Sequence, residues 1–148
     1  MRRVPAEITL PLRQRVLRPH ETLDQLRLAG DDDPDTGHFA AVEATGEVVG
    51  TASVRREAPP WAPADTGAWR LRGMATAESR RGGGIGTVVL RAVVGHVAGH
   101  GGGLLWCNAR LPALTFYQRA GFESRGDVWD EPPIGPHIAM QRVVRSAG

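Results

Sequence analysis

A glycine-rich turn at residues 80–86 is the feature that most constrains how this chain can fold. The residues before it, 69–75, read as a strand, and apolar residues recur after it at four-residue steps up to Val97, which predicts a helix. Glycines permit positive φ and close approach of a ligand, and the unpaired N–H groups at a helix start attract anions. The pattern therefore predicts a strand–turn–helix unit that binds phosphate oxygens.

Three phosphate-binding patterns compete for this turn. A Walker loop ends in Gly-Lys-Ser/Thr, and the chain contains no lysine. A dinucleotide fingerprint needs a third small residue where Val89 stands, and an acid about 20 residues on, near Gly103, where none occurs. The third pattern, Arg/Gln-x-x-Gly-x-Gly/Ala, is met by residues 81–86. An ordinary flexible strand-to-helix loop is the remaining alternative.

The composition excludes several classes of function. All 18 basic residues are arginine and the net charge is only +2, so the pI of about 9.4 does not reflect a polybasic patch that binds nucleic acid. The absence of lysine rules out Schiff-base chemistry and a lysine general base. Cys107 is the single cysteine, which rules out an intrachain disulfide and a cysteine-based metal cage.

The length of 148 residues is typical of one domain, so we expect a single domain over residues 1–148. The two arginines near the start are followed by no apolar run, so they do not begin a signal peptide. No stretch approaches the roughly 18 apolar residues that span a membrane. We therefore expect a cytoplasmic protein with no membrane partner.

Hydrophobic patterning predicts an α/β fold (α+β, mixed sheet) with about seven strands and three to four helices. An antiparallel meander comes first, a β-α-β crossover makes the fourth and fifth strands parallel, and two strands follow. The expected strands are 7–10, 38–43, 47–54, 68–75, 104–108, 122–129 and 137–144. The expected helices are 11–17, 85–97 and 112–120, and a linker or short helix is expected at 20–28. Loops are expected at 30–37 and 55–67, and a turn or wide loop at 130–136.

A second motif lies downstream at residues 113–122, which read Ala-Leu-Thr-Phe-Tyr-Gln-Arg-Ala-Gly-Phe. Together with the glycine-rich turn it resembles the two hallmark motifs of the GCN5-related N-acetyltransferase (GNAT) superfamily, in the same order around one crossover helix. Residues 134–138 resemble the tail of a small single-domain bacterial branch of that superfamily. The resemblance implies the GNAT-type fold, with splayed parallel strands four and five, and an N-acetyltransferase that uses acetyl-CoA and no metal.

The resemblance also implies where acetyl-CoA binds. The backbone of residues 74–76 is expected to pair with the pantetheine amides, and the Met74 N–H to polarise the thioester carbonyl. Many members carry Asn three residues before the second motif, where this chain has Arg110, so Asn108 is the candidate substitute. The expected cofactor-binding residues are Met74, Ala75, Thr76, Arg81, Gly82, Gly83, Gly84, Ile85, Gly86, Thr87, Asn108 and Tyr117.

Two residues are the expected catalytic groups. Tyr117 matches the family tyrosine that protonates the coenzyme A sulfur, and a phenol pKa near about 10 and a thiol pKa near about 8.5 make that transfer feasible; the alternative is a packed helix residue. His137 is the first candidate for the general base because imidazole titrates near neutral pH, and a structural histidine that bonds the loop is an equal alternative. The other candidates for the base are Glu131, Asp130, Asp127, His38 and a water chain to solvent.

The acceptor is expected to be a small molecule with a primary amine, and its identity depends on the three loops. Trp61, Trp69 and Trp129 are candidates to shape the acceptor pocket, and Arg72 is a candidate to line it or to pair with a carboxylate. A non-catalytic acyl-CoA-binding regulatory module is the alternative function, and the presence of Tyr117 speaks against it. A homodimer is plausible for this superfamily, and a nucleic-acid partner is not expected.

Overall fold

The computed structural model describes residues 1–148 and contains a seven-stranded mixed sheet and three α-helices. The strand order is β1-β2-β3-β4-β5-β7-β6, in which β4 and β5 run parallel. The strands are β1 (Arg2–Arg3), β2 (Gly37–Val42), β3 (Val48–Arg56), β4 (Trp69–Thr76), β5 (Gly103–Arg110), β6 (Glu123–Glu131) and β7 (Gly135–Val144). The α-helices are α1 (Ala6–Leu17), α2 (Ile85–Gly99) and α3 (Leu114–Arg119). Short 3-10 turns lie at Asp24–Leu26, Glu78–Arg80 and Leu111–Ala113.

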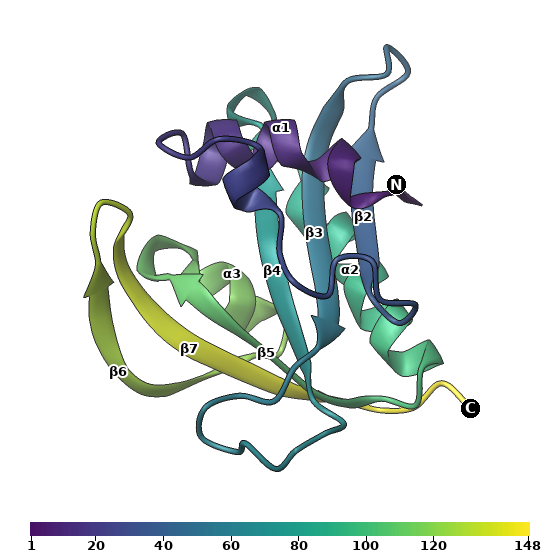
Figure 1. The fold of residues 1–148 in the computed structure, drawn as a ribbon, viewed down its shortest axis with the longest axis vertical. Helices are drawn as coiled ribbons and strands as arrows, with labels where there is room; N and C mark the ends of the chain where they lie inside the picture. The colour runs from purple at the N-terminus through teal and green to yellow at the C-terminus, as the bar shows by residue number, and fades with distance from the viewer. The chain divides into compact units, whose positions relative to one another are not determined.

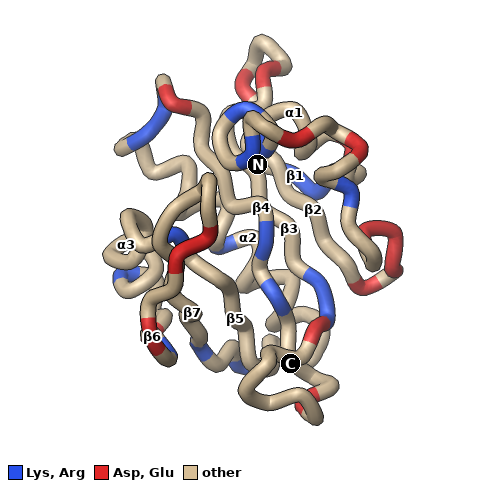
Figure 2. Tube along the Cα trace, turned by 60° about the vertical axis from the view of Figure 1, so that its left-hand side comes forward, with Lys and Arg blue, Asp and Glu red and all other residues tan.

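The chain divides into two compact units. The first contains Met1–Arg55 and Leu71–His96, and the second contains Arg56–Arg70 and Val97–Gly148. Basic and acidic segments are interspersed along the chain and do not gather into one long basic stretch (Figure 2). None of the helices combines the length and the apolar character that a membrane crossing requires.

In the first unit, helices cover both faces of the antiparallel strands. Figure 1 shows α1 in front of β2 and β3, and α2 behind them. Because both faces are covered, β2 and β3 are buried almost from end to end. Gly50 on β3 lets the start of α2 approach closely, since Ile85 and Val89 stand where its side chain would be. The regularly spaced apolar residues of α2 thus form its contact with the sheet.

In the second unit, β5, β7 and β6 form an antiparallel sheet that begins beside the first residues of β4. Trp69 and Arg70 of β4 pair in parallel register with Leu105 and Trp106 of β5. Helix α3 covers one face of this sheet, and β6 is exposed along its whole length because it is the edge strand. Figure 1 shows β6 and β7 as a long curved hairpin.

Most of the predicted elements are confirmed by the structure. The meander strands, the crossover helix, the parallel strand after it and the last two strands lie where the patterning places them, within a few residues. The predicted helix at 112–120 is a 3-10 turn followed by α3. The mixed-sheet fold class is therefore confirmed.

The predicted strand at 7–10 is wrong, because these residues lie in α1, which runs through Pro11. Ala6, Leu10 and Arg13 are buried on one face of this helix, at helical spacing. Packing of that face outweighs the cost of a proline inside a helix. The short strand β1 was not predicted, and it pairs Arg2 and Arg3 with β2.

The connection at 130–136, for which we expect a turn or a wide loop, is a tight turn. Strand β6 extends to Glu131 and β7 begins at Gly135, so that only residues 132–134 connect them. The prolines that favoured a loop lie in the turn itself and at the second residue of β7. The tight hairpin brings Glu131 close to the start of β7.

Gly50 and Gly95 offer a matched test of how α2 packs. A Cβ on Gly50 would lie 2.6 Å from Ile85 Cγ2, whereas a Cβ on Gly95 of α2 would meet nothing within 4 Å. We expect Gly50→Ala to lower the free energy of unfolding by about 1–3 kcal/mol through overpacking. We expect Gly95→Ala to raise it by about 0.5–1 kcal/mol through helix propensity. Urea denaturation measures both, and equal effects would contradict the close packing of α2 on β3.

Candidate active site

The glycine-rich loop lies in the first unit, between the end of β4 and the start of α2. Residues 81–84 are exposed, and Gly82 and Gly84 have φ of 81° and 84°. A Cβ on either glycine would meet nothing within 4 Å, so the backbone conformation and not crowding requires glycine there. The N–H groups of the first turn of α2, which starts at Ile85, have no partner inside the helix. The loop therefore presents a group of open donors to solvent.

The two arginines of this loop have different roles. The Arg80 guanidinium donates to both carboxylate oxygens of Glu43, with Nε 2.9 Å from Oε1, and this bond raises the pKa of Arg80. Arg81 is exposed and forms no ion pair. Arg80 therefore anchors the loop to the β2–β3 hairpin, while Arg81 is available to an anionic ligand.

The end of β4 carries a break in its regular strand conformation. Gly73 has φ of 62°, and its carbonyl accepts a hydrogen bond of 2.9 Å from Thr51 Oγ1. A glycine in the left-handed region within a strand is typical of a bulge, which interrupts strand pairing and re-aims the residues after it. The interruption comes directly before Met74, Ala75 and Thr76, to which the resemblance assigns the pantetheine arm.

Tyr117 lies on α3 in the second unit, only 5% exposed, with its ring in edge contact with Phe116 and Phe122. Its hydroxyl hydrogen-bonds the thiol of Cys107 on β5. Burial, followed by the charge and hydrogen bond of Cys107, raises the pKa of Tyr117 well above its ordinary value. The phenol is therefore fully protonated near neutral pH and faces a sulfur atom.

The pKa of Cys107 indicates how strongly burial disfavours a thiolate in this environment. Burial raises the pKa of Cys107 to about 12, and the charge of Arg70 and the bond from Tyr117 offset only part of that rise. Desolvation disfavours the charged form of any thiol in the same surroundings. A sulfur anion next to Tyr117 is therefore a strong base.

His137 lies near the start of β7, opposite Trp129 of β6 and Arg110 of β5. It is 4% exposed, and its ring stacks on Trp129 with centroids 5.7 Å apart and planes at 25°. Nδ1 lies 2.8 Å from the Gly135 carbonyl oxygen, so in the neutral ring Nδ1–H donates and Nε2 carries the lone pair. Nε2 lies 3.5 Å from Glu131 Oε2, where a carboxylate stabilises the ring once it has taken a proton.

Tyr117 and His137 belong to opposite faces of the β5–β7 sheet. Cys107, which Tyr117 contacts, pairs with Met140, while Arg110 pairs with His137 three residues farther on. Side chains alternate between faces along a strand, so an offset of three residues reverses the face. The face with α3 thus holds a proton donor, and the other face holds a proton acceptor.

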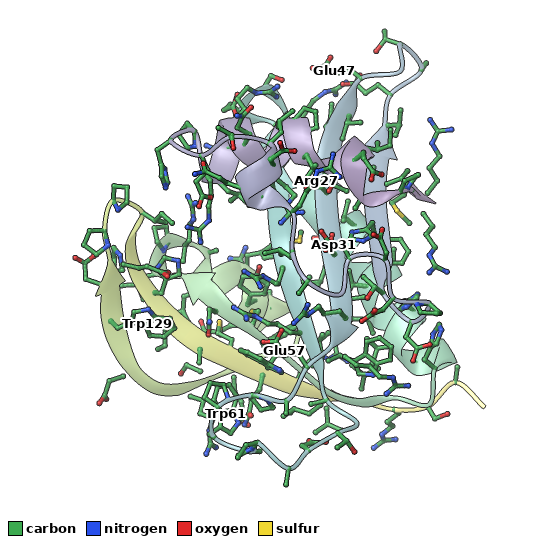
Figure 3. All side chains as sticks on the ribbon, in the orientation of Figure 1. Arg27, Asp31, Glu47, Glu57, Trp61 and Trp129 are labelled. Carbon is green, nitrogen blue, oxygen red and sulfur yellow. The ribbon has the colours of Figure 1, made fainter.

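The loop before β4 is attached to the face that bears Trp106. Trp61 packs edge-on against Trp106 at 5.5 Å, and Arg125 lies over the Trp61 ring at 5.1 Å. Trp106 Nε1 donates to the Glu57 carbonyl, and Arg70 Nη1 lies 2.8 Å from Glu57 Oε2. Figure 3 shows Trp61 in this loop and Trp129 on the β6–β7 hairpin. Of the tryptophans expected at a pocket, Trp129 is therefore the one in contact with His137.

The remaining candidates are distributed as follows. Both ring nitrogens of His38 are occupied, Nδ1 by Ser53 Oγ at 2.6 Å and Nε2 by the Asp31 carbonyl at 2.9 Å, which indicates a structural role. Trp69 is fully buried. Asn108 is exposed on β5, and Asp127 and Asp130 are exposed on β6, while Thr87 is exposed in the first turn of α2.

Comparison with known proteins points to one family. The family model described as acetyltransferase (GNAT) matches residues 7–122. The N-acetyltransferase YitI of Bacillus subtilis, itself uncharacterized, is 31% identical over 144 residues, which cover 97% of this chain and 95% of that protein. A GCN5-related N-acetyltransferase from Kribbella flavida has a TM-score of 0.72 at 20% identity, covering 96% of this chain and 95% of that one. An aminoglycoside 6'-N-acetyltransferase complexed with coenzyme A has a TM-score of 0.65 at 17% identity, covering 96% and 92%.

The burial of Cys107 predicts that this thiol is unreactive in the native protein. With a pKa of about 12, only on the order of one thiol in 10⁴ is ionised at about pH 8. We expect native protein to react with a chromogenic disulfide at least ~100-fold more slowly than protein unfolded in urea, measured by absorbance. Equal rates would show that Cys107 is accessible and that the surroundings of Tyr117 are wet.

Proposed function

This chain belongs to the acetyltransferase (GNAT) family and is an N-acetyltransferase, and we propose that it transfers the acetyl group of acetyl-CoA directly to the primary amine of a small acceptor. The observation that carries this proposal is the exposed glycine-rich loop, with left-handed Gly82 and Gly84 beside the unpaired Arg81. The aminoglycoside acetyltransferase of the same fold acts on a small amine, which supports a small acceptor.

The glycine-rich loop is proposed to bind the pyrophosphate of acetyl-CoA. The N–H groups of Gly82 and of residues 84–87 are open donors at a helix start, whereas the Gly83 N–H donates to the Arg80 carbonyl. The helix dipole there favours phosphate oxygens. Arg81 adds a guanidinium that no carboxylate neutralises, unlike Arg80. Met74, Ala75 and Thr76 are proposed to pair with the pantetheine amides, and the Met74 N–H to polarise the thioester carbonyl.

Tyr117 is proposed to protonate the sulfur that leaves. The amine nitrogen bonds to the carbonyl carbon, the carbon–sulfur bond breaks, and the sulfur receives the phenolic proton. Burial makes that thiolate a strong base, as the pKa of about 12 at Cys107 indicates for this environment. The high pKa of the Tyr117 phenol is therefore matched to the proton it must give.

His137 is proposed to be the general base, acting through Nε2. An alkyl ammonium group must lose a proton before it can attack, and Nε2 is the free lone pair when Nδ1–H is bonded to Gly135. Glu131, 3.5 Å away, compensates the imidazolium charge and is 48% exposed, so it also attracts a cationic amine. Asp127, Asp130 and a water chain are the competing bases.

The state of the chain's one thiol supports direct transfer without an acetylated enzyme. Cys107 is the one thiol of the chain, and it is buried and protonated, which makes it a poor nucleophile for a covalent intermediate.

Gly84→Glu tests the acetyl-CoA site, and Gly46→Glu is its matched control. Both glycines have similar positive φ, 84° and 88°, and open space where a Cβ would be, so the two variants bear the same strain and charge. We expect calorimetric titration to show acetyl-CoA binding to the wild type and to Gly46→Glu. We expect Gly84→Glu to lose at least about 100-fold in affinity, because a carboxylate then stands at the anion site. Equal binding by both variants would overturn the assignment of the loop.

Tyr117→Phe and His137→Gln separate the acid from the base. With the fastest acceptor from a panel of primary amines, we expect Tyr117→Phe to lower kcat by about 10²–10³-fold with little change in the KM for acetyl-CoA. We expect His137→Gln to lose the rise of kcat/KM with pH that the wild type shows on its acidic limb, because a base acts only when deprotonated. Thiol release measured against pH checks both.

Two results would contradict these roles. Wild-type kcat in Tyr117→Phe would mean that the sulfur is protonated by solvent. An unchanged acidic limb in His137→Gln would assign the base to Glu131, Asp127, Asp130 or water, and Glu131→Gln then tests whether the Glu131 carboxylate acts alone.

A further inference from the structure

Arg13 is a buried cation without an anionic partner. It lies on α1 and is 5% exposed. Its hydrogen bond joins Nη1 to Thr9 Oγ1 over 3.4 Å, and no carboxylate forms an ion pair with it. Burial lowers the pKa of Arg13, the charge of Asp31 offsets part of that effect, and the charge of Arg18 adds to it. The group is thus held in its charged form in unfavourable surroundings.

Two other arginines of the chain have the carboxylate partner that Arg13 lacks. Arg70, which is partly buried, lies 2.8 Å from Glu57, and the exposed Arg80 is bonded to both oxygens of Glu43. Buried charges in proteins are almost always paired, because desolvation of a lone ion is expensive. Asp31 does not fill this role, since it forms no ion pair with Arg13 and its charge offsets only part of the effect of burial on the Arg13 pKa. An exception of this kind indicates that an anion from outside completes the site.

The position of Arg13 connects it to the reaction. A Cβ on Gly73 would lie 2.6 Å from Arg13 Nε and 3.1 Å from Cζ, so the guanidinium lies directly on the β4 backbone. The left-handed glycine removes the side chain that would displace it. Gly73 immediately precedes Met74, whose N–H we assign to the thioester carbonyl. Both elements, α1 and this part of β4, belong to the first unit.

We propose that Arg13 binds a carboxylate of the acceptor, which makes the acceptor an amine that also carries a carboxylate, as amino acids and peptides do. The planar guanidinium fork matches a carboxylate in two parallel hydrogen bonds. Thr9 Oγ1 accepts from Nη1 over 3.4 Å and is the one hydrogen-bond acceptor of the guanidinium, so its other N–H donors are left for a carboxylate. This inference rests on the proposed function, which supplies the amine and its acetylation.

Acetate is the probe that tests the anion site directly. In ¹⁵N-labelled protein, the Arg13 Nε–H signal is identified by its loss in Arg13→Lys and in Arg13→Met. We expect acetate to shift this signal saturably, while acetamide, its neutral isostere, does not. The same shift with both probes, or no saturable shift with acetate, overturns the proposal. Acetate binding to Arg13 does not require acetyl transfer, so this result is independent of whether the proposed function holds.

Thermal unfolding separates a binding role from a structural one. Arg15, on the same helix, is exposed and paired with Glu78 at 3.4 Å, so Arg15→Met is the matched control. We expect Arg13→Met to raise the melting temperature by a few degrees, because it removes a buried charge that has no partner. We expect Arg15→Met to change it little. A melting temperature lowered by Arg13→Met would show that the residue supports the fold, and would overturn the proposal.

The affinity for acetyl-CoA identifies the source of the anion. We expect calorimetry to give the same acetyl-CoA affinity for Arg13→Met and the wild type, since the carboxylate belongs to the acceptor. A loss of at least tenfold would assign Arg13 to a phosphate of acetyl-CoA and overturn the acceptor proposal. Absence of acetyl-CoA binding in the wild type would instead contradict the proposed function itself.

Discussion

Left-handed backbone at two glycines bounds the part of the first unit to which we assign acetyl-CoA. Gly73 interrupts β4 and leaves room for the Arg13 guanidinium, and Gly84 ends the turn from which α2 starts. Between them lie the residues assigned to the thioester and the pyrophosphate. Only glycine takes these φ values without strain. The two positions therefore determine where the regular conformation of β4 is interrupted and where the open N–H donors before α2 begin. The helix behind them is held in place by its close contact with Gly50.

Burial, rather than any unusual residue, keeps two acidic side chains of the second unit protonated. The same desolvation raises the pKa of Tyr117 and of Cys107, so a phenol and a thiol remain protonated side by side. On the opposite face, the ring of His137 is fixed by a backbone carbonyl on one nitrogen and by Trp129 beneath it, which leaves the second nitrogen toward Glu131. The proposed acid and the proposed base thus lie on opposite faces of this sheet.

The sequence predicted the elements whose patterns are local and missed those set by distant contacts. Apolar runs between turn residues identified the meander and β7, and four-residue spacing identified α2. Residues 7–10 were misread because α1 acquires its buried face only through packing. The two loop arginines look equivalent in sequence, and only the position of Glu43, far along the chain, distinguishes Arg80 from Arg81. The grouping of Trp129, Glu131 and His137 follows from a hairpin tighter than its prolines indicated. No sequence pattern singled out Arg13, because the lack of a carboxylate partner is a property of the folded state.

Because the chain contains arginine and no lysine, residue type does not distinguish structural from functional cations. The presence or absence of a carboxylate partner distinguishes them. Arg70 and Arg80 are bound to carboxylates of their own unit, and their removal would leave those acids alone. Arg81 is unpaired but exposed, where water solvates it at little cost. Arg13 is unpaired and buried, the one combination that a fold does not favour for its own stability. The lack of a carboxylate partner therefore carries more weight at Arg13 than at Arg81, whose assignment to a phosphate rests on its place beside the glycine-rich turn at the start of α2.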